Sequence, residues 1–191
     1  MSYKTRHAIF LDRDGVIVNP VIRNNQPAAP WSMEDFSLTK DAKEVCRSLY
    51  MCGYDLFVVS NQPDVARGNL DLKTLDKMNT YLHEELPLRE ILNCIHDDED
   101  ECLCRKPNPG MINILEELYD IDKSRSFMIG DGWRDCGAAN LADVRMILLR
   151  KKYNFIDRFT NFISDDPLFE YKSVWTLKGA MNWILSNDKI I

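Results

Sequence analysis

Near its N-terminus the chain reads Ala8-Ile9-Phe10-Leu11-Asp12-Arg13-Asp14-Gly15. The apolar run that ends at Leu11 is typical of a buried strand and is too short to span a membrane. Asp12 and Asp14 follow at once, and their carboxylates would repel each other unless a cation lies between them. Because ligands of open α/β sheets bind beyond the carboxyl ends of the strands, we expect chemistry at the end of this strand. A strand followed by an ordinary Asp-Gly turn explains the same residues, so the rest of the chain has to distinguish the two.

Composition narrows the class of protein. The 191 residues are 45% hydrophobic and 28% charged, which predicts one globular domain over residues 1–191. The net charge of -6 disfavours a nucleic-acid-binding surface, which usually needs a basic face. Neither a signal peptide nor a transmembrane span is recognisable, so we expect a cytoplasmic monomer whose partner is a small molecule rather than nucleic acid or membrane. The six cysteines should then be reduced, and their clustering suggests a metal before a disulfide.

Apolar strand patterns alternate with helical patterns along the chain. Strands are expected at 7–12, 54–59, 91–95, 126–130, 145–149 and weakly near 174–175, with helices at 39–51, 71–86, 108–119, 134–141 and 178–185. Residues 16–37 contain several Asn and Pro residues and predict a long irregular segment, whose far end Trp31 and Phe36 should attach to the body. The alternation predicts an α/β fold in three layers, with a parallel sheet covered by helices on both faces.

Polar residues recur where successive predicted strands end. They are Asp12 and Asp14, Ser60 and Asn61, Arg105 and Lys106, and Asp131 and Asp135. The carboxyl ends of parallel strands lie along one edge of the sheet, so the pattern predicts that these side chains meet there. An isolated Asp-Gly turn or a solvated lysine explains any one of these positions, but not all of them in order.

These motifs resemble those of the haloacid dehalogenase (HAD) superfamily. The matching residues are Asp12-Arg13-Asp14-Gly15-Val16, Ser60, Lys106 and Gly130-Asp131-Gly132-Trp133-Arg134-Asp135. Within the superfamily the chain is similar to the histidinol-phosphate and heptose-bisphosphate phosphatases, through Ser60-Asn61-Gln62, Ala66-Arg67-Gly68, Cys94-Ile95-His96 and the run from Cys102 to Met111. The resemblance covers about residues 7–150. It implies a Rossmann-like HAD fold with a zinc-bound loop and no large cap domain.

The resemblance also implies a reaction. Asp12 would be the nucleophile that forms an aspartyl-phosphate, and Asp14 the general acid and base. Asp12, Asp131 and the backbone carbonyl of Asp14 would hold a catalytic Mg²⁺, which prefers oxygen ligands. Asp135 would support the site, either through a metal-bound water or by orienting Lys106.

Further residues would hold the substrate. Ser60 and Lys106 would bind phosphoryl oxygens as charge moves in the transition state. The substrate-binding candidates are Arg13, Asn61, Gln62, Arg105 and Gly132. The heptose phosphatases carry Ser-Gly-Ile after the Asn-Gln pair, whereas this chain has Pro63-Asp64-Val65. That departure leaves the chemistry intact and makes the substrate the open question.

A second metal is expected in the cysteine-bearing loop. Cys94, His96, Cys102 and Cys104 form a Cys₃His set, which is typical of tetrahedral structural zinc. The spacing is tighter than in the usual zinc knuckle, but the resemblance places zinc ligands at these positions. We therefore expect a structural Zn²⁺ that fixes the loop before Arg105 and Lys106, with an unliganded loop as the alternative.

The expected function is Mg²⁺-dependent hydrolysis of a small sugar phosphate, with a heptose bisphosphate favoured as substrate. Histidinol phosphate is the first alternative, because the same motifs serve it. A polynucleotide 3′-phosphatase shares the chemistry but conflicts with the acidic balance. A zinc-stabilised binding module with a dead site is the alternative that is not an enzyme.

Overall fold

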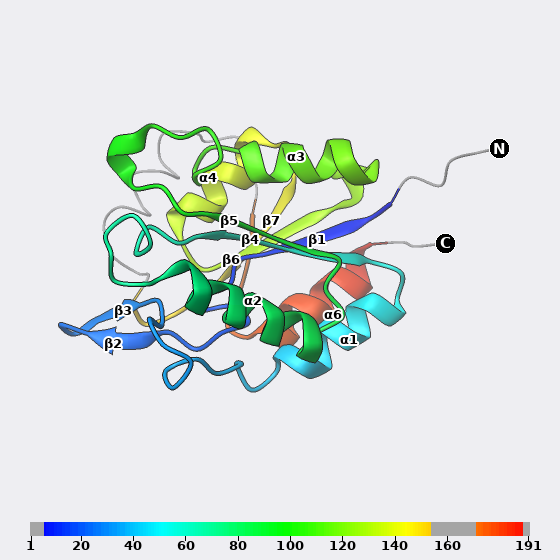
Figure 1. Ribbon diagram of the computed structural model, residues 1–191. Helices are drawn as coiled ribbons and strands as arrows, with labels where there is room; N and C mark the ends of the chain where they lie inside the picture. The colour runs from blue at the N-terminus through cyan, green and yellow to red at the C-terminus, as the bar shows by residue number, and fades with distance from the viewer. Residues whose placement is uncertain (1–5, 154–170, 189–191) are drawn as a thin grey trace.

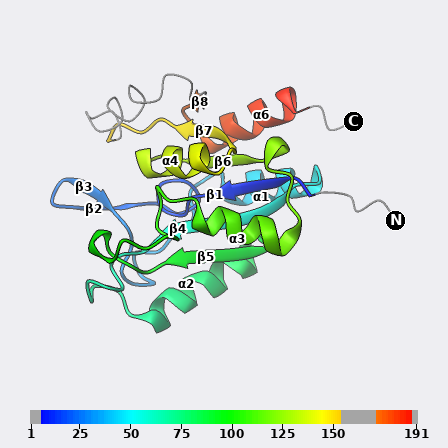
Figure 2. The ribbon, with the colours of Figure 1, turned by 90° about the horizontal axis from the view of Figure 1, so that it is seen from above.

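A six-stranded parallel sheet forms the centre of the computed structural model, which describes residues 6–153 and 171–188. Its strand order is β5-β4-β1-β6-β7-β8 (Figures 1 and 2). The strands are β1 (Ala8–Leu11), β4 (Asp55–Asn61), β5 (Glu90–Cys94), β6 (Phe127–Gly130), β7 (Arg145–Leu149) and β8 (Tyr171–Val174). The order runs outward from β1 in both directions, so the switch point that favours ligand binding lies at the carboxyl end of β1.

Helices cover both faces of the sheet. Figure 1 shows α3 (Gly110–Tyr119) and α4 (Trp133–Leu141) on one face, and α1 (Ala42–Met51), α2 (Leu72–Glu85) and α6 (Leu177–Asn187) on the other. Alternate residues of β1 divide between the two cores: Ile9 and Leu11 pack with the α1, α2 and α6 side, and Ala8 and Phe10 with the α3 and α4 side. Burial on both faces explains why the strand is a continuous apolar run. The three-layer α/β prediction is confirmed.

Side-chain caps set the start of two helices, and the sequence predicts the one at Asp71. Asp71 accepts a hydrogen bond from the Thr74 amide at 3.0 Å and begins α2, and the Thr176 hydroxyl accepts one from the Gly179 amide at 3.0 Å before α6. Helix α1 begins at Ala42, later than expected, because Lys40 and Asp41 lie in a turn whose last residue makes no side-chain cap.

The segment 16–37 is less irregular than expected. It contains an antiparallel hairpin of β2 (Val21–Arg23) and β3 (Gln26–Ala28). Asn24 and Asn25 form its turn with φ values of 50° and 58°, which asparagine tolerates better than most residues. Figure 2 shows the hairpin beyond the carboxyl ends of the sheet strands. Only this hairpin and α1 are regular elements between β1 and β4, which leaves no cap domain there.

Phe36 attaches the far end of this segment, as expected. Its side chain is 8% exposed and packs edge-on against Tyr81 of α2 with ring centroids 5.9 Å apart. Trp31 is partly buried against the same core. Across 6–153 and 171–188, every helix is too short or too polar to cross a membrane.

Candidate active site

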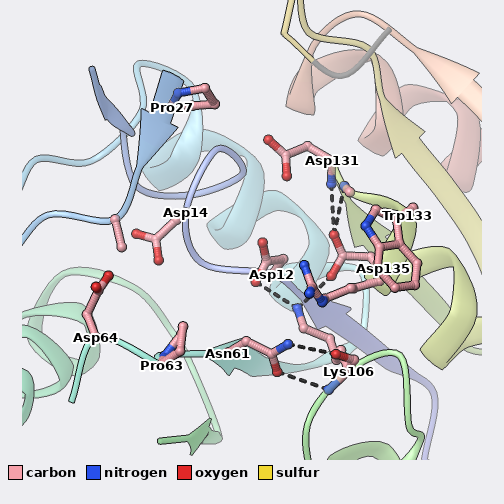
Figure 3. A pocket seen from close by; sticks show the side chains of 13 residues that line it. Asp12, Asp14, Pro27, Asn61, Pro63, Asp64, Lys106, Asp131, Trp133 and Asp135 are labelled. Atoms are coloured by element: carbon pink, nitrogen blue, oxygen red, sulfur yellow. Dashed lines mark hydrogen bonds and ion pairs between the residues drawn. The ribbon is translucent and has the colours of Figure 1, made fainter. Parts of the chain in front are cut away.

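A pocket of about 330 Å³ opens at the carboxyl ends of β1, β4 and β6 (Figure 3). It is lined by Asp12, Asp14, Pro27, Ala29, Asn61, Pro63, Asp64, Lys106, Asp131, Gly132, Trp133, Arg134 and Asp135. The structure thus brings together residues from all of the strand ends that the sequence singled out. The hairpin β2–β3 contributes one wall through Pro27.

Lys106 lies at the base of this pocket and is 3% exposed. Its ammonium donates to Oδ1 of Asp12 at 2.8 Å and to Oδ1 of Asp135 at 2.5 Å. Asn61 fixes the Lys106 backbone, accepting from its amide at 3.0 Å and donating to its carbonyl at 2.9 Å. Asn61 therefore holds the segment that carries the lysine as well as lining the pocket.

Asp135 is held at the start of α4. Its Oδ2 accepts hydrogen bonds from the amides of Gly132 at 2.9 Å and Asp131 at 3.2 Å. A Cβ atom on Gly130 would collide with the Asp135 side chain, so glycine allows β6 to pass this close. The supporting role expected for Asp135, which is to orient Lys106, agrees with this geometry.

Three carboxylates converge in the pocket in a way that suits a divalent cation. One oxygen each of Asp12, Asp131 and Asp135 lies within 4.8 Å of the others. Burial raises the pKa of Asp12 to about 8 and that of Asp131 to about 7, and the neighbouring carboxylates add to both shifts. Since carboxylate oxygens are the ligands that Mg²⁺ prefers, this donor set fits magnesium.

Asp14 stands apart from that group. Figure 3 shows its side chain on the side of the pocket near Pro27 and Asp64. The Arg13 Nε donates to both Asp14 oxygens at 3.1–3.2 Å, and Gln62 Nε2 donates to Oδ2 at 2.8 Å. Two fixed donors therefore set where the Asp14 carboxylate points.

Arg13 and Gln62 lie behind Asp14 and not in the pocket lining. Both are expected to contact substrate, but both are fully buried. Arg13 also donates to Gln62 Oε1 at 2.8 Å and lies over the ring of Phe36, 5.6 Å from its centroid. These side chains have no exposed surface and lie behind Asp14, so their contact with substrate stays a prediction.

Ser60 and Arg105 also lie outside the pocket lining. Ser60 is fully buried within β4, and its hydroxyl accepts a hydrogen bond from Gln62 Nε2 at 2.8 Å. Arg105 is 7% exposed and binds Asp98 Oδ1 at 2.9 Å and the His96 carbonyl at 3.1 Å. Contact of either side chain with a phosphoryl group would require rearrangement, so these roles stay predictions.

Several lining residues were not assigned from the sequence. Arg134 donates to both oxygens of Asp98 at 3.1 Å. Its guanidinium carbon lies 4.8 Å from the centroid of the Trp133 ring. Asp64 is 9% exposed, and its Oδ1 accepts from Asn69 at 3.0 Å. Trp133 and Arg134 stand inside the recognised acidic motif, which was a signal for them, whereas Pro27 belongs to the unexpected hairpin.

The four predicted zinc ligands form a second cluster. One ligand atom each from Cys94, His96, Cys102 and Cys104 lies within 4.8 Å of the others. His96 Nδ1 is 3.5 Å from the Cys94 sulfur and 3.7 Å from the Cys104 sulfur. Three thiols and one imidazole gathered this closely fit tetrahedral Zn²⁺.

Arginines neutralise the acidic residues of the same loop. Arg67 binds Asp97 through two hydrogen bonds of 2.5 and 2.6 Å, while Arg105 and Arg134 share Asp98. Asp97 also caps the 3₁₀ turn η1 (Asp98–Asp100). The loop is therefore tied to the chain after β4, to the segment before Lys106 and to α4.

Comparisons with known proteins identify the family of this chain. A model of HAD-hydrolase-like proteins matches residues 103–152. A D-glycero-beta-D-manno-heptose-1,7-bisphosphate 7-phosphatase of Helicobacter pylori strain J99 is 36% identical over 152 residues, covering 76% of this chain and 83% of that protein. A D-glycero-alpha-D-manno-heptose-1,7-bisphosphate 7-phosphatase of Campylobacter jejuni is 31% identical over 176 residues, covering 87% and 98%.

Solved structures show the same fold. The D,D-heptose 1,7-bisphosphate phosphatase of B. bronchiseptica, crystallised with magnesium and phosphate, superposes with a TM-score of 0.77 over 94% of this chain and 98% of that one, at 24% identity. The chain belongs to the D-glycero-D-manno-heptose-1,7-bisphosphate 7-phosphatase family of HAD-like hydrolases.

Proposed function

We propose that this protein is a Mg²⁺-dependent phosphatase that hydrolyses D-glycero-D-manno-heptose 1,7-bisphosphate at position 7. The observation that supports this most is the contact of Lys106 with both Asp12 and Asp135 beside Asp131, at the carboxyl end of β1. In the proposed reaction these residues would act as nucleophile, cation and metal-binding carboxylate around one point. That combination suits phosphoryl transfer, which depends on positioning and charge compensation.

In the first step, a carboxylate oxygen of Asp12 forms a bond to phosphorus while the bond from phosphorus to the sugar oxygen breaks. Asp14 gives its proton to the leaving oxygen, so the sugar departs as an alcohol. Asp12 and Asp131, with the backbone carbonyl of Asp14, would hold Mg²⁺, and the bound cation would screen the repulsion between the Asp12 carboxylate and the phosphate dianion. Lys106 compensates the negative charge next to Asp12 at 2.8 Å.

In the second step, water attacks the phosphorus atom of the aspartyl-phosphate. Asp14, now a carboxylate, accepts the proton of that water, and Asp12 is released unchanged with inorganic phosphate. Asp14 acts in both steps and therefore needs a fixed direction. The hydrogen bonds from Arg13 and Gln62 supply it, which gives these buried residues a positioning role.

The zinc loop would act at a distance from the chemistry. Zinc held by Cys94, His96, Cys102 and Cys104 closes the loop directly before Arg105 and Lys106. Asp98 of that loop also binds Arg134 in the pocket wall. We propose a structural zinc whose removal loosens this wall and the lysine segment together.

A substrate panel tests the proposal. The purified full-length protein is assayed for phosphate release from both anomers of the heptose bisphosphate, since relatives named for each anomer match this chain. Histidinol phosphate and a 3′-phosphorylated DNA are included, each with Mg²⁺ and with a chelator. The proposal predicts Mg²⁺-dependent turnover, fastest on one heptose anomer. Faster turnover of histidinol phosphate or DNA would contradict the substrate, and absence of turnover on every phosphoester would contradict an enzyme.

A further inference from the structure

A tyrosine from outside the family motifs reaches the proposed magnesium site. Tyr153 follows β7, and its hydroxyl donates a hydrogen bond of 2.6 Å to Oδ2 of Asp131. The last recognised motif ends at Asp135, the resemblance covers residues up to about 150, and the family model matches up to residue 152. The tyrosine is thus a feature of this chain that neither the motifs nor the model match assigns.

The contact lies in a closely packed part of the site. A Cβ atom on Gly15 would overlap Asp131 Oδ2 and come within 2.8 Å of the Tyr153 hydroxyl. No space for an additional side-chain atom therefore remains where the loop after β1 meets Asp131 and Tyr153. Gly15 has a φ of +86°, which also favours glycine at this point.

The 2.6 Å hydrogen bond from the Tyr153 hydroxyl restricts the orientation of the Asp131 carboxylate. The terminal torsion of an aspartate is broad, so an unsupported Asp131 would present its oxygens over a range of directions. A short hydrogen bond to one oxygen narrows that range and fixes the direction of the other. Partners of this kind behind metal ligands commonly change metal affinity by about 10- to 100-fold.

We propose that Tyr153 is a positioning residue that orients Asp131 for magnesium, and this rests on the metal site of the proposed function. The hydroxyl holds Oδ2 on the Gly15 side of the pocket. Asp131 can then meet Asp12 and Asp135, whose oxygens lie within 4.8 Å, without losing conformational freedom on binding. Tyr153 thereby lowers the magnesium concentration at which the site fills.

The variant Tyr153→Phe removes only the hydroxyl. Magnesium binding to the full-length protein, without substrate, is measured by isothermal titration calorimetry. We expect the dissociation constant to rise by about 10- to 100-fold. In turnover assays the magnesium concentration for half-maximal rate should rise similarly, with kcat at saturating magnesium nearly unchanged.

Tyr119→Phe is the matched control. Its hydroxyl also donates to a carboxylate, Glu90 Oε2 at 3.2 Å, but it lies at the end of α3, next to the start of β5. This control should bind magnesium as the wild type does. Magnesium-induced thermal stabilisation of all three proteins gives a second, independent measure of affinity.

The measured magnesium affinities test the positioning role of Tyr153 and the metal site separately. Unchanged affinity in Tyr153→Phe would overturn the positioning role while leaving the metal site intact. Tighter binding would also overturn it, because Tyr153 would then compete with magnesium for Asp131. If the wild type itself bound no magnesium, the metal site and this inference would both fail.

Discussion

The ammonium of Lys106 lies 2.8 Å from Oδ1 of Asp12, with both side chains at the base of the pocket. The lysine comes from the segment after the cysteine-bearing loop and the aspartate from the end of β1, so their contact joins two of the recognised motifs. A buried cation beside a carboxylate allows that carboxylate to approach a phosphate with less repulsion. It also balances the charge of Asp135, which lies 2.5 Å from the same ammonium.

Replacing Lys106 with methionine should therefore damage both stability and activity. The change leaves Asp12 and Asp135 without their cation in a buried site, and breaking such a pair costs about 3–5 kcal/mol. We expect kcat to fall by about 10²- to 10³-fold, as when a charge-stabilising donor is lost. Denaturant unfolding and steady-state assays measure the two effects.

Lys178→Met is the control for Lys106→Met. Lys178 pairs with Glu44 on the surface, where both side chains are about half exposed, so its loss should change stability little and leave activity unchanged. Equal effects of the two variants would contradict the role assigned to Lys106.

Gly15→Ala should displace Asp131. The added Cβ overlaps Asp131 Oδ2, so the side chain has to move away from the position it takes in the pocket. We expect at least about 10-fold weaker magnesium binding, as for other losses of ligand orientation. Gly68→Ala is the matched control, since its φ of +74° brings the same backbone strain with nothing within 4 Å of the new Cβ. A magnesium affinity that fell equally in both variants would show that backbone strain, and not the overlap, is responsible.

Loss of a zinc ligand should lower activity without touching the catalytic residues. Protein purified without chelator should contain about one zinc per chain, and Cys102→Ser should contain much less. Because the loop orders Arg105 and the Lys106 segment, we expect kcat to fall as zinc is lost. Cys52→Ser, at an exposed cysteine outside the cluster, should keep both zinc and activity. Wild-type protein without zinc, or full activity in zinc-free Cys102→Ser, would refute this role.

The burial of Cys46 can be tested through the pH dependence of the free energy of unfolding. Burial on the inner face of α1 raises the pKa of this thiol from 9.0 to about 12. Between these values the unfolded chain loses the proton and the folded chain keeps it, so the free energy of unfolding falls as pH rises, by at most about 1.4 kcal/mol per pH unit. Below pH 9 this thiol adds no slope, because both states hold the proton.

Two variants isolate that slope. Cys46→Ala should lose stability less steeply than the wild type between about pH 9 and pH 11, measured by denaturant unfolding. Cys52→Ala, at an exposed cysteine, should follow the wild type. Identical slopes for Cys46→Ala and the wild type would mean that Cys46 is accessible to solvent.

Much of the fold follows from local pattern. The strands β1, β4, β6 and β7 are apolar runs bounded by polar residues, and they lie where the pattern places them. The hairpin β2–β3 was missed because each strand has three residues and β3 contains Pro27. The Asn24-Asn25 pair between Val21-Ile22 and Pro27-Ala28 was the available signal, since consecutive asparagines favour a hairpin turn.

The main charged residues that line the pocket were predictable, but the residues that pack behind them were not. Asp12, Lys106, Asp131 and Asp135 meet because parallel strands end at one edge, which sequence order alone reveals. The burial of Arg13 was not predictable, because arginine is rarely buried unless paired and its partners Asp14 and Gln62 meet only in the folded chain. Tyr153 belongs to no periodic element, so its contact with Asp131 is visible only in three dimensions.

The central claim is that Asp12 carries the phosphoryl group during turnover. Asp14 acts in both steps, so the aspartyl-phosphate is trapped in the wild type by acid quench during turnover, before water releases the phosphate. Acid-quenched protein incubated with Mg²⁺ and heptose bisphosphate is digested and mapped by peptide mass spectrometry. We expect a phosphoryl group on Asp12 that hydroxylamine removes and that Asp12→Asn lacks. An Asp12→Asn variant that still releases phosphate at the wild-type rate would contradict it.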